Sequence, residues 1–295
     1  MVIDMEELKT HQPSMTIDEQ VENLKGKRLV ISDEEYAKKV LSEISYFRLI
    51  KAYSLGLKEK NGYYHNDVSF EQLVELYYFN ASFRQITFKE IEKIEVALRC
   101  RISNFIADTY GVLGYCDEKN FKDIEYHATF INDVKEEISR NSRAPFVKNF
   151  KENYEGGQLP IYALVEILSF GTLSKFYKNM KNADKKQIAR SFGIGYTYFE
   201  SWIESISYVR NICAHYGRIY NAKLSKTPMM YKQYSEAGIG NNRIFAVLLC
   251  IKSILISDES WNHFVDKLQS MIDKSNYVDI STMGFPADWI DYLKV

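Results

Sequence analysis

The chain has 295 residues, of which 46% are hydrophobic and 26% are charged. Such a chain can bury one large core or two modest ones, and nothing in its composition indicates disorder. Its 38 basic and 39 acidic residues give a formal net charge of -1, so no global positive field exists and any nucleic acid must be met by a local basic patch.

The cysteines, at positions 100, 116, 213 and 250, form no CxxC pair and no cysteine–histidine cluster with zinc-like spacing. This argues against a disulfide scaffold and a structural metal, and fits a reducing cytosol. The N-terminal segment MVIDMEELKT is acidic and lacks an apolar signal core, and the longest apolar run, Ile244 to Ile256, is short and carries Lys252. We therefore expect a cytoplasmic protein with no membrane-spanning segment, no cofactor and no metal.

Three capping-box patterns predict helix starts in the N-terminal part of the chain. The pairs are Thr16 with Glu19, Ser32 with Glu35, and Ser69 with Gln72. After Ser69, apolar residues recur at helical spacing until Gly111. This pattern predicts one very long helix, or two helices with a bend.

Residues 110–120, YGVLGYCDEKN, have the glycines and the polar end of a loop. We treat the chain as a single helical protein over 1–295, and a subdivision near 110–122 would separate an N-terminal part, 1–110, from a C-terminal part, 123–295. Beyond this loop, Pro160 suits a first helical position and Gly171–Thr172 suits a helix break. Further helices are expected over residues 123–141, 145–153, 161–170, 173–180, 184–191, 196–217, 242–256 and 258–273. Because strand signals are sparse, the predicted fold is an all-α multi-helix bundle.

The segment 196–217 gives the clearest helical pattern. Its apolar stripe consists of Phe199, Trp202, Ile203, Ile206, Val209, Cys213 and Tyr216. On a helix at roughly 100° per residue, Asn211, His215 and Arg218 share one polar edge. Arg210 points about 140° away from His215, into the apolar stripe.

Two interpretations of this segment are open. In the structural one, Arg210 is a buried or half-buried residue paired with a carboxylate, and His215 is a surface histidine near a helix C-terminus, where its charged form is mildly favoured. In the functional one, the helix packs against its own copy in a two-fold dimer, and Arg210 and His215 meet partner groups in a composite cleft. Histidine then exchanges protons at neutral pH while arginine holds a phosphate. Structural residues outnumber catalytic ones, so composition alone favours the first.

The sequence RNICAHYGRIYN at 210–221 resembles the signature of the Abi-like (abortive infection) family. Its Arg-x4-His core, with a polar residue after the arginine, is similar to the RNA-cleaving motif of the HEPN superfamily. Other blocks resemble the family in the same order: LSEISYFRLIKAY at 41–53, IEKIEVALRCRI at 91–102, LPIYALVEILSFGTLSKFY at 159–177 and MGFPADW at 283–289. The resemblance covers about 40–290, and the ordered blocks are far more specific than the short motif.

This resemblance implies HEPN-like helices and a role in phage defence or a toxin–antitoxin-like setting, with RNA as substrate and a homodimer as the active form. By the resemblance, Arg210 stabilises the developing phosphorane charge and His215 acts as general acid or base. Asn211 positions the phosphate or the histidine, and Arg218 and Asn221 contact substrate or support the other residues. Some relatives of this kind do not cut RNA. The alternative is a protein that binds a small structured RNA, or a defence adaptor that docks through the apolar face around Trp202 and Tyr216.

A second basic region lies at 171–190. Its basic residues are Lys175, Lys178, Lys181, Lys185, Lys186 and Arg190. The region has one acid, Asp184, and its basic residues are interleaved with the rings of Phe176 and Tyr177. It is either a patch that binds successive phosphates of RNA, with contacts from Lys175 and Lys178, or a solvated lysine-rich helix face.

Other polar residues suggest no catalysis. Glu92 and Glu95 lie one turn apart, but Lys93 and Arg99 make ordinary helix-surface ion pairs the favoured interpretation. Arg99 and Arg101 should project to different sides of their helix. Cys213 lies about 160° from His215 around the helix, which argues against a cysteine–histidine nucleophile. The remaining histidines, at 11, 65, 127 and 263, show no metal-ligand pattern.

Overall fold

A computed structural model describes residue 11, residues 13–255 and residues 259–295. This part of the chain contains no β-strand, only isolated bridges such as the one between Val30 and Ser69, so the all-α prediction is confirmed. The acidic segment MVIDMEELKT lies outside the described residues, as do Ile256 and residue 258 at the expected ends of two helices.

The α-helices are α1 (Ile17–Gly26), α2 (Glu34–Glu43), α3 (Phe70–Tyr110), α4 (Ile124–Arg140), α5 (Pro145–Asn153), α6 (Ile161–Ile167), α7 (Phe170–Asn179), α8 (Asn182–Arg190), α9 (Tyr196–Ala214), α10 (Lys232–Glu236), α11 (Ile244–Ile254), α12 (Trp261–Asp273) and α13 (Trp289–Leu293). A π-helical turn spans Phe47–Lys51, and 3₁₀ turns span Gly114–Cys116, Glu118–Asn120, Glu155–Gly157 and Ile280–Met283.

The chain divides by its contacts into two compact units, Met1–Phe79 and Asn80–Val295. The division falls within α3, which is one continuous helix of 41 residues. Of the two alternatives left open by the sequence, the single long helix is therefore the one observed. The loop at 110–122, the subdivision considered from the sequence, lies inside the second unit.

Capping residues set the helix starts of the first unit, two of them as predicted. Thr16 and Glu19 form the complete reciprocal capping box of α1, and the Ser69 hydroxyl accepts a hydrogen bond from the Gln72 amide at the start of α3, at 3.1 Å. The prediction of a capping box formed by Ser32 and Glu35 was wrong. Asp33, a favoured N-cap residue, caps α2, because its carboxylate accepts from the Tyr36 amide at 2.9 Å. The Ser32 hydroxyl donates instead to Glu71 at 2.7 Å.

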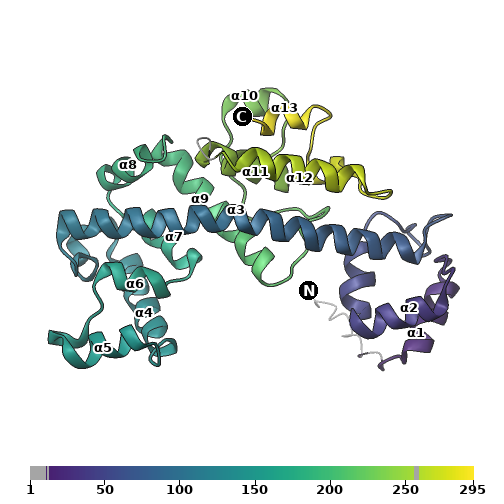
Figure 1. Cartoon of the computed structure of the whole chain (residues 1–295), viewed down its shortest axis with the longest axis horizontal. Coiled ribbons are helices and arrows are strands. Elements are labelled where there is room, and N and C mark those ends of the chain that lie inside the picture. Colours follow the sequence, from purple (N-terminus) through teal and green to yellow (C-terminus); the bar gives the residue numbers. More distant parts are fainter. Residues whose placement is uncertain (1–10, 12, 256–258) are drawn as a thin grey trace, which may run out of the picture. The chain divides into compact units, whose positions relative to one another are not determined.

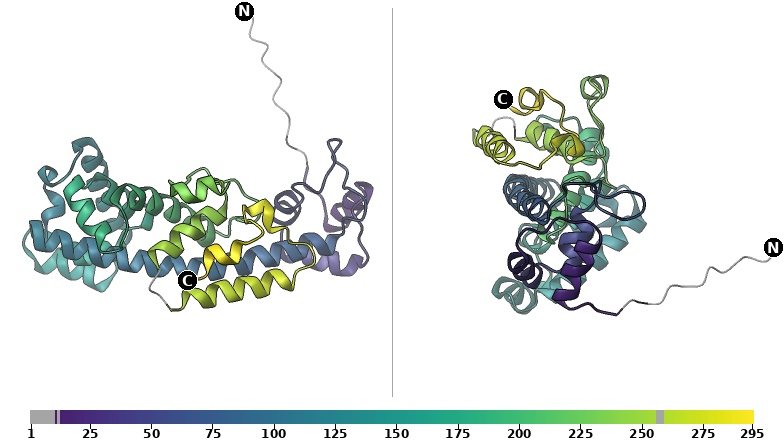
Figure 2. Two further views of the ribbon diagram at one scale, coloured as in Figure 1. Left: turned by 90° about the horizontal axis from the view of Figure 1, so that it is seen from above. Right: turned by 90° about the vertical axis from the view of Figure 1, so that its right-hand side faces the viewer.

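The second unit places α9 among several other helices. Helix α9 packs against α7, α8 and α11, while α7 also contacts α4. Helix α11 is buried over nearly its whole length, which explains why its sequence is apolar on every side. Figures 1 and 2 draw the described elements as helices, with α3 as one unbroken helix.

The junction of α6 and α7 differs from the prediction by a few residues. Pro160 is the residue before α6 rather than its first residue. The break falls at Leu168 and Ser169, because the Ser169 hydroxyl accepts from the Thr172 amide at 3.0 Å and starts α7 there. Gly171 consequently lies inside α7 rather than at a break.

No single helix among the described residues is both long and apolar enough to cross a membrane. The segments Glu155–Ile167 and Phe170–Asn179 meet that requirement only when taken together, with a bend of 113° between them.

Candidate functional site

The motif RNICAH spans the C-terminal end of α9. Helix α9 ends at Ala214, and His215 is its C-cap. Tyr216 has φ of 57°, and the amide of Gly217 donates to the carbonyl of Ile212 at 2.7 Å. This is the hydrogen-bond pattern of a Schellman motif, which turns the chain out of the helix. The prediction of a helix to residue 217 was therefore wrong, whereas His215 does lie at the helix C-terminus, as the structural interpretation expected.

Gly217 and Tyr216 have different roles in this turn. A Cβ atom at Gly217 would come within 2.8 Å of the Ile212 side chain, so the close approach of the chain requires glycine. Tyr216 holds the left-handed position, where a bulky side chain is strained. Its side chain is 69% exposed, so the prediction that it completes the apolar stripe was also wrong.

Arg218 and Asn221 lie in the loop after α9, not on a helical edge with Asn211 and His215. The Arg218 Nη1 donates to the carbonyls of Tyr220 and Asn221, at 3.1 and 3.3 Å. The Asn221 side-chain oxygen accepts from Arg243 Nη1 at 3.3 Å. These bonds shape the loop, and a contact of either residue with substrate stays a prediction.

Arg210 is paired with a carboxylate from α3, as the structural interpretation required. Its Nε donates to Glu95 Oε2 at 3.0 Å, and the second Glu95 oxygen accepts from Arg99 Nη2 at 2.5 Å. Glu95 is only 7% exposed, so its expected helix-surface ion pair is in fact buried. The terminal Nη nitrogens of Arg210 donate no hydrogen bond to any described residue.

Asn211 and His215 are both exposed, and the His215 amide donates to the Asn211 carbonyl at 3.0 Å. Within the described chain, no hydrogen bond or ion pair joins His215 to Arg210. The structure therefore leaves the imidazole facing solvent and the guanidinium facing α3. One copy alone does not bring the two groups together.

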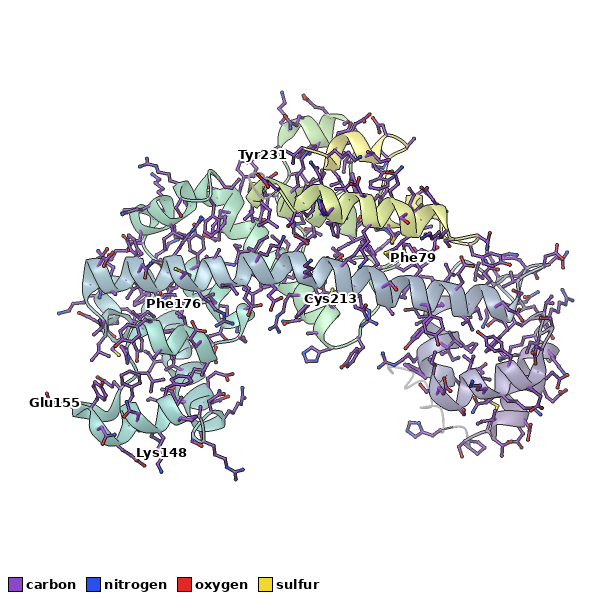
Figure 3. All side chains as sticks on the ribbon, in the orientation of Figure 1. Phe79, Lys148, Glu155, Phe176, Cys213 and Tyr231 are labelled. Carbon is purple, nitrogen blue, oxygen red and sulfur yellow. The ribbon has the colours of Figure 1, made fainter. Side chains whose placement is uncertain are left out.

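A pocket of about 340 Å³ lies beside this end of α9. It is lined by Ala81, Arg84, Gln85, Phe88, Cys213, Ala214 and Tyr216. Figure 3 shows Cys213 where α9 meets α3. Phe88 lies under the Arg210 guanidinium, with 5.7 Å between the guanidinium carbon and the ring centroid, while Ala214 and Tyr216 flank His215 in the chain. The pocket thus adjoins both ends of the motif.

Sequence reasoning missed Arg84 and Phe88. Arg84 precedes the buried residues Ile91 and Leu98 by one and two heptads and is itself buried. A basic residue in such a repeat on a long helix was the available signal. The sequence does not show what Arg84 contacts, because its Nη1 lies 3.5 Å from the Cys213 carbonyl on α9, far away in the chain.

Cys213 is not an activated nucleophile. Burial raises the pKa of its thiol to about 12, against a smaller opposing effect of the Arg84 charge. The thiol is therefore protonated at neutral pH, in agreement with the argument against a cysteine–histidine pair. The described residues also hold no group of three or more histidine, cysteine, aspartate or glutamate side chains arranged to bind a metal.

Three of the lysines at 175–190 lie near acidic side chains. Lys185 is 3% exposed and its ammonium lies 2.7 Å from Glu200, so a solvated face does not describe it. Lys178 lies 3.6 Å from Glu204. Lys175 is exposed, at 4.0 Å from Asp133. Nucleic-acid contact by Lys175 and Lys178 stays a prediction.

Two other expectations can be compared with the structure. Trp202 is 1% exposed and its indole nitrogen donates to the Met229 carbonyl at 2.7 Å, so the docking face expected around Trp202 and Tyr216 was wrong for Trp202. Arg99 and Arg101 do point to different partners, the Val165 carbonyl and the Ser191 hydroxyl.

The fold and the site together define an all-α protein that carries an arginine and a histidine at a helix end, beside a pocket. The family model for Abi-like proteins matches residues 39–221. Because the match spans more than half of the chain, the protein belongs to the Abi-like family. The matched range includes the motif and the blocks at 41–53, 91–102 and 159–177, whereas MGFPADW at 283–289 lies beyond it. No curated protein and no solved structure matches the chain.

Proposed function

We propose that this protein acts in phage defence as a metal-independent endoribonuclease whose active form is a homodimer. One observation carries the proposal: a pocket at the end of α9 adjoins Phe88, which Arg210 covers, and the residues on both sides of His215. Membership of the Abi-like family supports the setting of abortive infection. The RNA-cleaving assignment rests on the chemistry of the two side chains.

The proposed reaction needs one proton acceptor and one proton donor near the scissile phosphate. A histidine takes the proton of the ribose 2′-hydroxyl as O2′ bonds to phosphorus. The bond from phosphorus to O5′ then breaks, and O5′ takes a proton from a second acid. The products carry a 2′,3′-cyclic phosphate and a 5′-hydroxyl. The exposed imidazole of His215 suits the first or the second proton transfer.

Arg210 is held in a way that suits phosphate binding. Glu95 accepts from its Nε, which fixes the plane of the guanidinium while both terminal nitrogens remain available. A guanidinium binds phosphate through paired N–H groups and stabilises charge that develops in the transition state. Asn211 is next in the chain and exposed, and its proposed role is to position the phosphate.

The separation of these groups supports the proposed dimer. Since Arg210 and His215 do not meet within one copy, we propose that two α9 ends pack about a two-fold axis. Arg210 of one copy and the partner subunit's His215 then serve one phosphate. The pair of histidines supplies both the proton acceptor and the proton donor.

The test is cleavage of total cellular RNA by the purified protein in excess EDTA. We expect fragments with 2′,3′-cyclic phosphate ends from the native protein and none from His215→Ala. The matched control is His263→Ala, which removes another exposed histidine, on α12, and should cleave normally. Full activity of His215→Ala, or intact RNA with the native protein, would contradict the proposal.

A second function is favoured by the separation of Arg210 and His215 in one copy. A single copy can hold phosphate without assembling an acid and a base, as in a protein that retains a small structured RNA. This alternative predicts that nucleic acid co-purifies and that affinity falls steeply as salt rises. Protein free of nucleic acid and without salt-dependent binding would exclude it.

A further inference from the structure

Arg84 occupies an unusual position in the wall of the pocket. It is 7% exposed, yet its Nε has no hydrogen-bond partner and its Nη1 reaches the Cys213 carbonyl only at 3.5 Å. Among the described residues, no carboxylate pairs with it. Buried arginines are almost always paired, because an isolated charge is costly to remove from water. The pocket therefore has an uncompensated positive charge at its base.

Aromatic rings and small apolar groups form much of the rest of the pocket. Phe88 and Tyr216 both line it, and the Arg84 guanidinium carbon lies 5.8 Å from the centroid of the Tyr216 ring. No acidic residue is among the lining residues. At about 340 Å³, the pocket falls within the range of small-molecule sites.

We infer that this pocket binds one unpaired nucleotide of the RNA, with its base against the rings of Phe88 and Tyr216 and a phosphate oxygen against Arg84. The inference rests on the proposed function and deepens it. Stacking on aromatic rings and an arginine on the backbone are the usual means of holding single-stranded nucleic acid. The base must leave its helix to enter, so the pocket selects single strands and places the neighbouring phosphate beside Arg210 and His215.

The positive φ of Tyr216 is consistent with this use. A tyrosine at φ of 57° is a poor choice for a helix end, where glycine or asparagine is favoured. Strained residues of this kind concentrate at ligand-binding sites, where the surrounding structure holds them in place. The turn leaves the Tyr216 side chain 69% exposed, so a base can stack against it from solvent.

A purely structural explanation for Arg84 also exists. Arginines hydrogen-bond to the last carbonyls of helices, and the Cys213 carbonyl lies in the last turn of α9. The two explanations differ in one measurable property. A cap affects stability, whereas a phosphate contact also contributes to the salt dependence of nucleic-acid binding.

The test uses fluorescence anisotropy with the full-length protein and a labelled single-stranded DNA decamer of mixed sequence. DNA lacks the 2′-hydroxyl, so the proposed cleavage cannot occur and binding is measured alone. The informative variants are Tyr216→Asn, which removes the ring but suits the left-handed backbone, and Arg84→Gln. Tyr154→Ala is the control, since Tyr154 is an exposed tyrosine that does not line the pocket.

The two variants should differ in their effects. Tyr216→Asn should weaken binding by about 5- to 150-fold, the value of one stacked base, with the salt slope unchanged. Arg84→Gln should weaken binding and reduce the slope of log affinity against log salt by about 0.7, the contribution of one phosphate on a single strand. Arg84→Lys should keep that slope. Tyr154→Ala should bind as the native protein does, and duplex DNA should bind more weakly.

Several results would overturn the inference. These are no binding of the decamer by the native protein, a preference for the duplex, or native affinity in Tyr216→Asn. An Arg84→Gln protein with lower thermal stability but an unchanged salt slope would assign Arg84 to capping. Failure of the two proposals is distinguishable: decamer binding without RNA cleavage contradicts only the nuclease, and RNA cleavage with unaffected pocket variants contradicts only the pocket.

Discussion

Two carboxylates of the second unit each join two cations, but in different surroundings. Glu95 on α3 has a side chain 9% exposed, and Glu204 on α9 has one 36% exposed. The partners of Glu95 are Arg99 and Arg210, and those of Glu204 are Lys178 and Lys226. The same count of charges therefore gives one buried cluster and one surface network.

The difference shows what makes a basic residue usable at a site. A buried carboxylate holds a guanidinium in one orientation, since few alternative partners exist and the planar group bonds through defined nitrogens. Exposed lysines exchange their partners for water and salt ions at little cost. Arg210 is thus held in a fixed orientation over the Phe88 ring, whereas Lys178 is not. Basic composition alone did not distinguish the two regions.

The largest expected difference between the regions is in catalysis. Arg210→Ala should lower the rate of RNA cleavage by about 10²- to 10³-fold, the usual effect of removing one group that stabilises transition-state charge. Lys178→Ala should leave the rate near that of the native protein. Single-turnover rates on one defined RNA, in EDTA, measure both.

Arg99→Ala is the control for loss of the ion pair itself. It removes the other partner of Glu95 but no group of the motif, so it should fold less stably and still cleave RNA. Equal losses of rate in Arg210→Ala and Lys178→Ala would remove the distinction between the two regions.

The second prediction concerns stability. Glu95→Gln leaves two arginines without their carboxylate and should lower the free energy of unfolding by about 2–3 kcal/mol, somewhat less than for a fully buried pair, because the Arg210 side chain is 27% exposed. Glu204→Gln should cost less than about 1 kcal/mol. Urea unfolding followed by tryptophan fluorescence reports on the relevant unit, since Trp202, Trp261 and Trp289 all lie within Asn80–Val295. Similar losses in both variants would contradict the comparison.

Local patterns in the sequence predicted most helices, because periodicity and caps act within a few residues. They predicted the start of α9 correctly and its end incorrectly. A glycine is the expected left-handed residue after a helix, but here Tyr216 takes that conformation and Gly217 follows it. No sequence rule gives a tyrosine at this position, because bulky residues rarely adopt the left-handed conformation.

The sequence could predict the type of partner that a buried charged residue needs, but not which residue provides it. An arginine in an apolar stripe requires a carboxylate, and that expectation for Arg210 was correct. The sequence did not identify this carboxylate, because Glu95 lies 115 residues earlier in the chain and was interpreted as a surface residue. Arg84 was missed for the same reason, since its position beside α9 results from packing of distant segments.

The smallest expected effect is the pH dependence of the stability that the surface network around Glu204 contributes. Hydrogen bonding to Lys226, and to a lesser degree the charge of Lys178, lowers the pKa of Glu204 from its ordinary value of 4.5. A carboxylate with a lowered folded-state pKa stabilises the fold above its unfolded pKa, and that stabilisation is lost as pH falls through the folded value. The stability difference between the native protein and Glu204→Gln should therefore be constant from pH 7 to about pH 5 and should disappear in more acidic solution.

The stability difference for Glu204→Gln should also shrink in 1 M salt, where the screening length is about 3 Å. The difference for Glu95→Gln should persist in that salt, because its charges are shielded from ions. A Glu204→Gln difference that is unchanged by acid and salt would mean that Glu204 acts through packing, and the contrast between the two carboxylates would then be one of burial alone.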